Sequence, residues 1–399
     1  MVVQQTENAY PSSVFSHKKM SLTKTITIKC TLDCNLRCKY CYEFNRGNAD
    51  LNSRINEKEL SVIINRIAKL IPKSNILWLL HGGEPFSLGI NFYRTFCDIL
   101  RDVNNQYDVN FKTAIQTNGT LLNNDWIKLI EDNSHILSER ILSLSIDGPK
   151  KINDEVRVML NHKSAYDTLI ENIAKIKQSN FSFTTISVIG KHNINQPDTV
   201  YNHIRDLQPL FAKFIPCYNF NRNGQVEKYG ISPIEFAEFM CKVFDIWIND
   251  EKHNDKFRLD PIISIISNLI GERVSWCEYR KEKCDNFVTI FPNGDMWLCD
   301  VFNQDTMKDE AYLGNVFTLS DDDLVSVLCT PSNKCLFNEM YKRLSNKCTI
   351  CDINVYCYGG CITERYLMQK LSPKLFQEYC NGKHILINHI KNAVEQIKD

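Results

Sequence analysis

Residues 25–41 read TITIKCTLDCNLRCKYC, a strand-like run followed at once by three cysteines. Thr25–Lys29 is rich in β-branched residues, which favours a strand, and Cys34, Cys38 and Cys41 fall in the loop after it. Three thiolates within eight residues can bind three irons of a four-iron cubane and leave the fourth iron without a protein ligand. The alternative is a zinc knot or chance crowding. A typical zinc site spaces its cysteines in pairs and supplies four ligands locally, so the spacing favours a cluster with one open iron.

Short β-rich runs alternate with helical patterns after this segment. The further predicted strands are Ile76–Leu80, Phe111–Thr117, Ile141–Ile146, Phe183–Ile189 and Phe211–Pro216. Between the first two strands, apolar residues repeat at helical spacing from Leu60 until Pro72. Helical patterns also occur at Trp126–Ile130, at Tyr166–Ile176 and after Pro197. Six strands alternating with helices predict an α/β fold with a parallel sheet.

The composition excludes several classes of protein. The chain has 399 residues, 43% of them hydrophobic, and 47 basic residues balance 47 acidic ones. It can therefore bury large cores, and it has no net charge to attract nucleic acid or an anionic membrane. It contains no apolar run of membrane-spanning length and no apolar signal segment at its start, so we expect a cytoplasmic protein without a membrane partner. Cysteines number 17, and in a large intracellular chain such a number favours metal binding over disulfides.

Further motifs follow the predicted strands in order. Gly82-Gly83-Glu84-Pro85 follows the second strand, QTNGT (residues 116–120, with Asn118) the third, and SIDGP (residues 145–149, with Ser145) ends the fourth; Arg157 and Val188 come later. Taken singly, these motifs are ordinary turns, a helix cap or a surface arginine. Their order behind a CxxxCxxC loop with an aromatic residue before the third cysteine resembles the radical S-adenosylmethionine (SAM) enzymes.

This resemblance implies a fold, a cofactor and a reaction. The fold is a partial six-stranded parallel (β/α)6 barrel, with the active site at the carboxyl ends of the strands. The Gly82–Pro85 turn would hold the SAM amino group, Arg157 the SAM carboxylate with Ser145 nearby, and Val188 the adenine; Asn118 completes the implied SAM contacts. The family cleaves SAM reductively to methionine and a 5′-deoxyadenosyl radical, which removes a hydrogen atom from the substrate.

A second group of cysteines lies near the carboxyl end. The pattern Cys284-x9-Gly294-x4-Cys299, Cys348-x2-Cys351-x5-Cys357-x3-Cys361 and Cys380 is very similar to the SPASM extension of radical SAM peptide and protein maturases, and Cys277 lies just upstream. Eight thiolates would saturate two four-iron clusters, giving three [4Fe-4S] clusters in all. By resemblance, Cys277, Cys284, Cys299 and Cys361 would hold one auxiliary cluster, and Cys348, Cys351, Cys357 and Cys380 the other. Two zinc sites are the alternative, and Cys277 lies outside the seven-cysteine pattern.

The resemblance divides the chain and singles out Asp300. It gives a polar tail at 1–22, the barrel at 23–220, a helical bridge at 221–276, the SPASM domain at 277–380 and a closing helix at 381–399. Asp300 follows Cys299, where anaerobic sulfatase-maturating enzymes carry an aspartate that acts as a base; a turn cap is the alternative. The six cysteines outside the two cysteine groups are mostly expected in cores, and they are Cys30, Cys97, Cys217, Cys241, Cys329 and Cys335.

The expected function is oxidative modification of a side chain of a ribosomally made peptide, most simply a crosslink. The first alternative is an anaerobic sulfatase-maturating enzyme that converts Cys or Ser to formylglycine. The second is a non-catalytic metal-binding scaffold. A low-potential electron donor of the flavodoxin or ferredoxin type is expected. About thirty residues precede Cys34, which is too few for a leader-binding domain, so a separate leader-binding protein is a further expected partner.

Overall fold

The computed structural model describes residues 22–44, 50–221, 223–252, 257–274, 276–282, 284, 287–300, 311–330 and 346–398. Residues 1–21 of the predicted tail and Cys335 lie outside these ranges.

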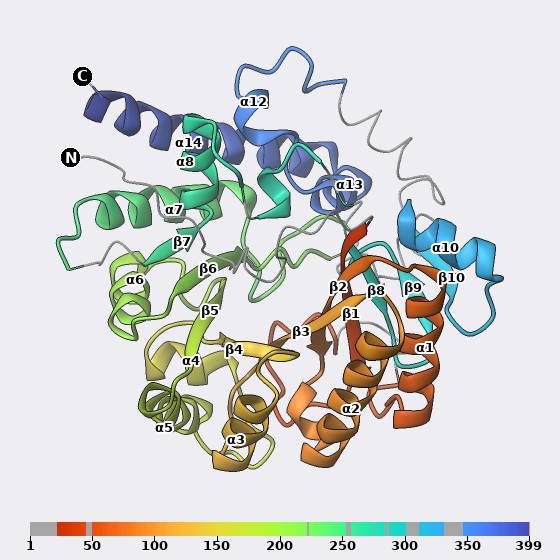
Figure 1. Cartoon of the computed structure of the whole chain (residues 1–399). Helices are drawn as coiled ribbons and strands as arrows, with labels where there is room; N and C mark the ends of the chain where they lie inside the picture. Colours follow the sequence, from red (N-terminus) through yellow and green to blue (C-terminus); the bar gives the residue numbers. More distant parts are fainter. Residues whose placement is uncertain are drawn as a thin grey trace.

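A parallel sheet forms the centre of the molecule and confirms the predicted α/β class (Figure 1). Its first six strands run in sequence order and pair in parallel: β1 (Leu22–Thr31), β2 (Ser74–Gly82), β3 (Asn110–Thr117), β4 (Leu137–Ser145), β5 (Ser182–Ile189) and β6 (Phe211–Pro216). Each coincides with a strand expected from the sequence. The sheet therefore gathers the carboxyl ends of these strands, and the motifs that follow them, at one edge.

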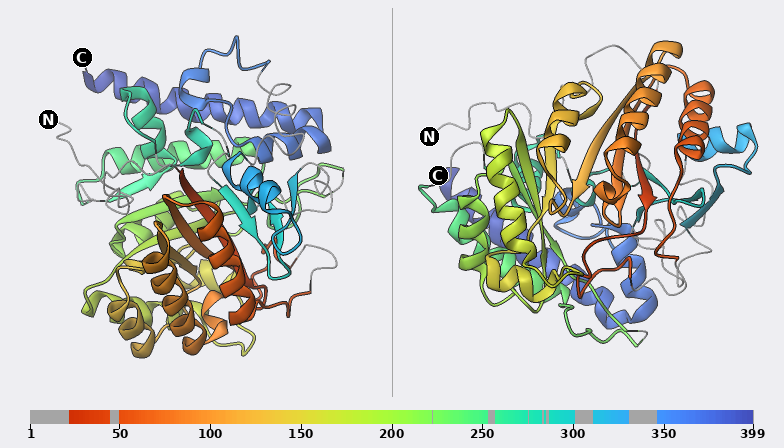
Figure 2. Two further views of the ribbon diagram at one scale, coloured as in Figure 1. Left: turned by 45° about the vertical axis from the view of Figure 1, so that its right-hand side comes forward. Right: turned by 90° about the horizontal axis from the view of Figure 1, so that it is seen from below.

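Helices cover the outer face of this curved sheet, as two further views show (Figure 2). They are α1 (Glu57–Leu70), α2 (Ile90–Gln106), α3 (Asn124–Asp132), α4 (Lys150–Val156), α5 (Ala165–Gln178) and α6 (Pro197–Asp206). In α1 a capping box joins Asn56 and Glu59, and Leu60, Ile63 and Ile64 are turned into the core. The helices supply the right-handed crossovers that parallel strands need.

The carboxyl-terminal part of the chain extends the same sheet. Strand β8 (Phe287–Ile290) pairs in parallel with β1, and β9 (Asp295–Trp297) and β10 (Tyr312–Asn315) follow in antiparallel order. At the other edge β7 (Arg258–Asp260) pairs in parallel with β6. Because β9 ends just before Cys299, this pairing carries Cys299 and Asp300 to the side of β1.

Most of the remaining helices pack along the last helix of the chain at one end of the sheet, and the helix that follows β10 stands apart from them (Figure 1). They are α7 (Pro233–Ile248), α8 (Ile262–Ile270), α10 (Asp321–Cys329), α12 (Asn354–Cys357), α13 (Ile362–Leu371) and α14 (Pro373–Lys398), with short 3-10 turns η2 (Pro85–Leu88) and η3 (Cys277–Tyr279). The helical bridge expected at 221–276 contains α7 and α8, and β7 lies between these two helices and pairs with β6. The closing helix begins at Pro373, earlier than expected.

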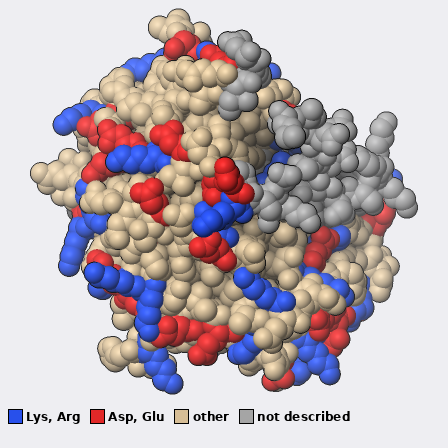
Figure 3. Space-filling view, turned by 90° about the vertical axis from the view of Figure 1, so that its left-hand side faces the viewer, with Lys and Arg blue, Asp and Glu red and all other residues tan. Residues whose placement is uncertain are grey.

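Charge is spread evenly over the face seen in Figure 3, where basic and acidic side chains alternate. This agrees with the zero net charge of the sequence. Within the described ranges, no helix combines the length and the apolar character that crossing a bilayer requires.

Candidate active site and cluster ligands

The first three cysteines lie in the loop that leaves β1. This loop is fastened to the segment after α4: Arg37 N donates to Val158 O at 2.7 Å, and Lys39 N donates to Val156 O at 2.9 Å. Cys34 and Cys38 pack against the small apolar cluster formed by Leu36, Met159 and Ala165. The backbone therefore holds the thiols in place through contacts with a distant part of the chain.

The chemistry of these thiols fits an iron–sulfur cluster. Burial raises the pKa of Cys38 to about 12 and also raises the pKa of Cys34 and Cys41. The thiols also raise one another's pKa because they lie close together: Cys41 raises the pKa of both Cys34 and Cys38. Three crowded, desolvated thiols become thiolates when a cationic centre sits among them, and irons supply that charge.

The Gly82–Pro85 turn packs directly against the start of the cysteine loop. Gly83 N donates to Thr31 O at 2.9 Å, and Glu84 N donates to Asp33 O at 2.8 Å. A Cβ at Gly83 would lie 2.0 Å from Asp33 O, so a side chain has no room at this position. The glycine therefore lets β2 and the cysteine loop approach, and this close contact explains one residue of the motif.

Glu84 and Asn118 tie the ends of β2 and β3 together. Glu84 is buried; its carboxylate accepts from Thr117 Oγ1 at 2.6 Å and from Asn118 N at 2.8 Å, and it also caps η2 through Phe86 N at 3.0 Å. Asn118 Nδ2 donates to Asn35 Oδ1 at 2.9 Å and lies 3.8 Å from Cys34 Sγ. The motif residues thus surround the first cysteine.

Asp147, in the SIDGP motif, is a fully buried hub that sequence reasoning did not single out. Its Oδ2 accepts from Tyr40 OH and from Arg157 Nε at 3.0 Å. Its Oδ1 accepts from Arg157 Nη2 at 3.1 Å and from Val188 N at 2.9 Å. Burial disfavours the carboxylate, but the Arg157 guanidinium outweighs it and holds the pKa of Asp147 well below its usual range. His192 stacks on Tyr40, with ring centroids 5.6 Å apart.

This hub places three of the predicted SAM contacts. Arg157 is buried, and its Nε and Nη2 donate hydrogen bonds to the Asp147 carboxylate. Val188 stands at the end of β5 with its backbone bound to the same carboxylate, and Ser145 ends β4 beside Ile186 of β5. Because Tyr40 lies between Cys38 and Cys41, Asp147 also fixes the cysteine loop.

Asp300 belongs to a second polar group, formed with the buried Lys29 and Glu43, the partly exposed His81 and the exposed Tyr42. The fully buried Lys29 ammonium pairs with both Glu43 and Asp300. Tyr42 OH donates to Asp300 Oδ2, and His81 Nδ1 lies 3.8 Å from that oxygen. These partners come from β1, the end of β2 and the segment after Cys41. The structure therefore brings Asp300 beside the first cysteine loop, although more than 250 residues separate them.

Sequence reasoning missed the partners of Asp300. A lysine inside the apolar run ITIK of β1 was the available signal, because a buried strand rarely carries a charge without a partner. Glu43 and His81 border the two motifs that were recognised, yet nothing in their spacing separates them from surface residues.

The carboxyl-terminal cysteines form two neighbourhoods. Burial raises the pKa of Cys380, and Cys348 and Cys351 raise it further, which places the three together. Burial likewise raises the pKa of Cys361, with a contribution from Cys277. Cys357 is buried, whereas Cys284 and Cys299 are partly buried against the core. Cys348, Cys351 and Cys380 thus lie in one neighbourhood, and Cys277 and Cys361 lie in the other. The assignment of all eight thiols to two clusters stays a prediction, and thiol donors of this kind suit iron.

Of the cysteines outside these groups, three lie in the core, as expected from the sequence for most of them. Cys30, Cys97 and Cys217 are buried, Cys241 is partly buried and Cys329 is exposed.

Comparison with known proteins identifies the domain that carries this site. Residues 28–204 match the model of the radical SAM superfamily. A cysteine-type anaerobic sulfatase-maturating enzyme of Clostridium novyi is 25% identical over 332 residues, covering 82% of this chain and 85% of the relative.

Two solved structures share the fold. Native anSMEcpe with bound AdoMet and Cp18Cys peptide superposes with a TM-score of 0.76 and 19% identity, over 94% of this chain and 98% of that chain. Streptococcus suis SuiB bound to precursor peptide SuiA superposes with a TM-score of 0.57 and 17% identity, over 87% of this chain and 73% of that chain. The match to the family model covers the cysteine loop, the Gly82–Pro85 turn and Arg157. The chain therefore carries a radical SAM domain at residues 28–204 and is a radical SAM enzyme.

Proposed function

We propose that this enzyme is a maturase that oxidises a side chain of a peptide or protein. The observation that carries the proposal is the position of Asp300, which Lys29 and Tyr42 hold beside the first cysteine loop. An acid–base group at this place suits a reaction that removes a proton as well as a hydrogen atom. The similarity to a sulfatase-maturating enzyme over most of both chains supports the substrate class.

The residues of the barrel have assigned tasks in this proposal. Cys34, Cys38 and Cys41 hold the cluster that binds SAM, and Gly83 lets the Gly82–Pro85 turn reach the SAM amino group. Arg157 uses Nε and Nη2 on Asp147, so we assign Nη1 to the SAM carboxylate. Ser145, Asn118 and Val188 line the same strand ends. A guanidinium fixed by a buried carboxylate is oriented before the ligand arrives, which lowers the cost of binding.

The oxidation balances as the loss of two hydrogen atoms. When bound, SAM and the three proposed [4Fe-4S] clusters supply the removal of one hydrogen atom and one electron from the substrate. The remaining proton leaves the substrate to Asp300. Lys29 forms an ion pair with the Asp300 carboxylate and so places a positive charge beside it. Lys29 and Glu43 are buried, whereas Asp300 keeps part of its surface exposed.

Two products fit this first oxidation. We propose a crosslink in a ribosomally made peptide, which agrees with the fold shared with SuiB, a protein solved with its precursor peptide. Conversion of Cys or Ser to formylglycine is the second candidate, favoured by the named relative and by the position of Asp300 directly after Cys299. A flavodoxin- or ferredoxin-type donor would supply the electron that starts each turnover, and a separate protein would present the leader of a precursor peptide.

Mass spectrometry of peptides incubated anaerobically with the reconstituted enzyme separates these products. Candidate peptides are those encoded beside the gene and those carrying a sulfatase motif. A crosslink loses two hydrogens and gives no aldehyde. Formylglycine from Ser also loses two hydrogens but reacts with an aldehyde probe, and formylglycine from Cys additionally exchanges sulfur for oxygen. Preparations that cleave SAM but leave every peptide of both kinds unchanged would contradict the proposed substrate class. A scaffold would yield no 5′-deoxyadenosine.

A further inference from the structure

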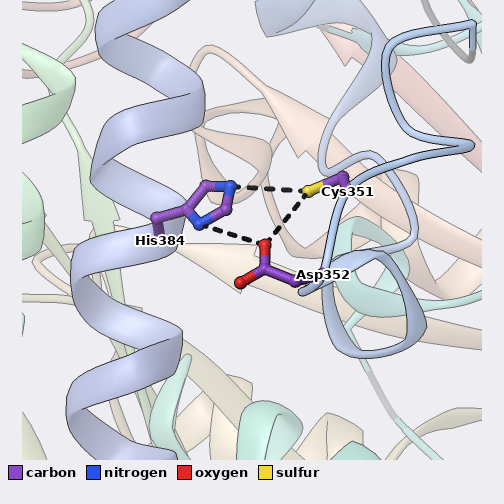
Figure 4. A group of neighbouring side chains, drawn as sticks. All are labelled: Cys351, Asp352 and His384. Atoms are coloured by element: carbon purple, nitrogen blue, oxygen red, sulfur yellow. Dashed lines mark hydrogen bonds and ion pairs between the residues drawn. The ribbon is translucent and has the colours of Figure 1, made fainter.

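Helix α14 carries a histidine on the same face as one of the predicted cluster ligands. Cys380 and His384 are four residues apart, so they lie one turn apart on one side of the helix. That side faces the loop that holds Cys348 and Cys351 (Figure 4). The geometry of the helix therefore directs an imidazole at the second auxiliary cluster.

The imidazole lies between a thiol and a carboxylate, as Figure 4 shows. His384 Nε2 is 3.4 Å from Cys351 Sγ, within hydrogen-bonding range for sulfur, and Nδ1 is 3.6 Å from Asp352 Oδ1. Cys351 Sγ is also 4.0 Å from Asp352 Oδ1. A carboxylate on the far nitrogen of a histidine orients the ring, and this is the usual way in which proteins aim a histidine at a metal centre.

The exposure of the three side chains argues against an independent metal site. Asp352 is 75% exposed and His384 is 38% exposed, so both are at the protein surface. Cys351 lies three residues after Cys348 in the sequence, and both lie near Cys380. The proposed four-iron cluster needs the sulfur of Cys351 as a ligand. His384 and Asp352 are therefore neighbours of a cluster ligand at the solvent edge of the cluster.

We propose that His384 is a positioning residue that donates a hydrogen bond from Nε2 to the sulfur of Cys351 and thereby raises the reduction potential of the second auxiliary cluster. This inference rests on the proposed function with its three clusters, and the resemblance to SPASM enzymes gives that cluster the ligands Cys348, Cys351, Cys357 and Cys380. A hydrogen bond to a ligating sulfur withdraws negative charge, and the reduced cluster, which carries one more electron, gains more from it. The cluster would then accept an electron more readily.

The test compares three histidine variants in the full-length protein, reconstituted anaerobically. The background carries Cys34→Ala, Cys38→Ala and Cys41→Ala, so that only the auxiliary clusters contribute to the signal. His384→Ala removes the donor, and His384→Gln keeps an N–H group at nearly the same reach. The control is His389→Ala: His389 lies on the same helix and also faces a carboxylate, with Nε2 2.6 Å from Asp245 Oδ1.

Iron content and a redox titration monitored by electron paramagnetic resonance are the two measurements. We expect unchanged iron in all variants. In His384→Ala one of the two midpoint potentials should fall enough to change the ratio of reduced to oxidised cluster about tenfold, which is about 59 mV for a one-electron couple. His384→Gln should restore most of the shift, and His389→Ala should show none.

Three results would overturn the role of His384. These are an unchanged potential in His384→Ala, an equal shift in His389→Ala, and the loss of one cluster's iron in His384→Ala, which would make the histidine a ligand. Zinc in place of iron in the background protein, or no auxiliary iron, would overturn the proposed cluster as well. The metal analysis distinguishes this failure from the others before any potential is measured.

Discussion

The substitution Asp147→Asn should both destabilise the protein and disturb the first cysteine loop. Each carboxylate oxygen of Asp147 accepts two hydrogen bonds: Oδ2 from Tyr40 and Arg157, and Oδ1 from Arg157 and the Val188 backbone. An amide in either orientation turns its NH2 group toward two donors. Asp147→Asn therefore loses two accepted bonds and leaves the buried Arg157 charge without its counterion. Breaking a buried pair from one side costs about 3–5 kcal/mol.

The assay is equilibrium urea unfolding of the reduced, cluster-free chain, with Asp167→Asn as the matched control. Asp167 also pairs with a cation, Lys150, but both side chains are at least half exposed, so we expect no measurable change from its substitution. In reconstituted protein, Asp147→Asn should also lower SAM cleavage, because Arg157, a predicted SAM contact, loses one of its two acceptor oxygens in either orientation of the amide. An Asp147→Asn free energy of unfolding equal to that of Asp167→Asn would refute the reasoning.

The pH dependence of this difference follows from the depressed pKa of Asp147. A carboxylate with a lowered pKa in the folded state stabilises the fold above its unfolded pKa of about 3.9, and this contribution is lost as the pH falls toward the folded pKa. The difference in the free energy of unfolding between wild type and Asp147→Asn should thus be constant from about pH 5 to about pH 8, because this whole range lies above the unfolded pKa. It should narrow in more acidic solution. A gap that widens below about pH 4 would contradict the assignment.

Three further predictions concern single side chains. Gly83→Ala should abolish the first cluster, measured as iron, because its Cβ would lie 2.0 Å from Asp33 O. Gly271→Ala, where the added Cβ meets nothing within 4 Å, should keep the iron and lose about 1 kcal/mol because Gly271 has a positive φ. Asp300→Asn should form 5′-deoxyadenosine but lower peptide product about 10²–10⁴-fold, and normal product formation would dismiss its role as a base. Lys29→Met should leave the buried Glu43 and the partly buried Asp300 without their shared cation and destabilise the fold by about 3–5 kcal/mol in urea unfolding; a change below about 1 kcal/mol would mean that the pairs are solvated.

The six parallel strands could be predicted from the sequence because each is a run of five or more residues rich in β-branched and other apolar side chains. Strands β7 and β9 could not, since each has three residues and pairs only because the sheet presents an edge to it. A helical bridge was predicted at 221–276, but strand β7, which separates α7 from α8 within it, was not.

The residues of the candidate site also fall into those that the sequence could predict and those that it could not. Cys34, Glu84 and Arg157 were found because they belong to spaced motifs, and the structure places them together. Lys29 and His81 were not found, because their importance depends on Asp300, which reaches them through the pairing of β8 with β1. Long-range contacts of single residues leave no local pattern in the chain.

Anaerobic incubation of the reconstituted protein with SAM and a strong reductant, followed by quantification of 5′-deoxyadenosine, tests the central claim most directly. The wild-type chain should form it, and the Cys34→Ala, Cys38→Ala, Cys41→Ala variant should not, although it keeps its auxiliary iron. Cleavage that persists in the variant would place the reactive iron elsewhere. Absence of cleavage by a wild-type protein with its full iron content would contradict the account.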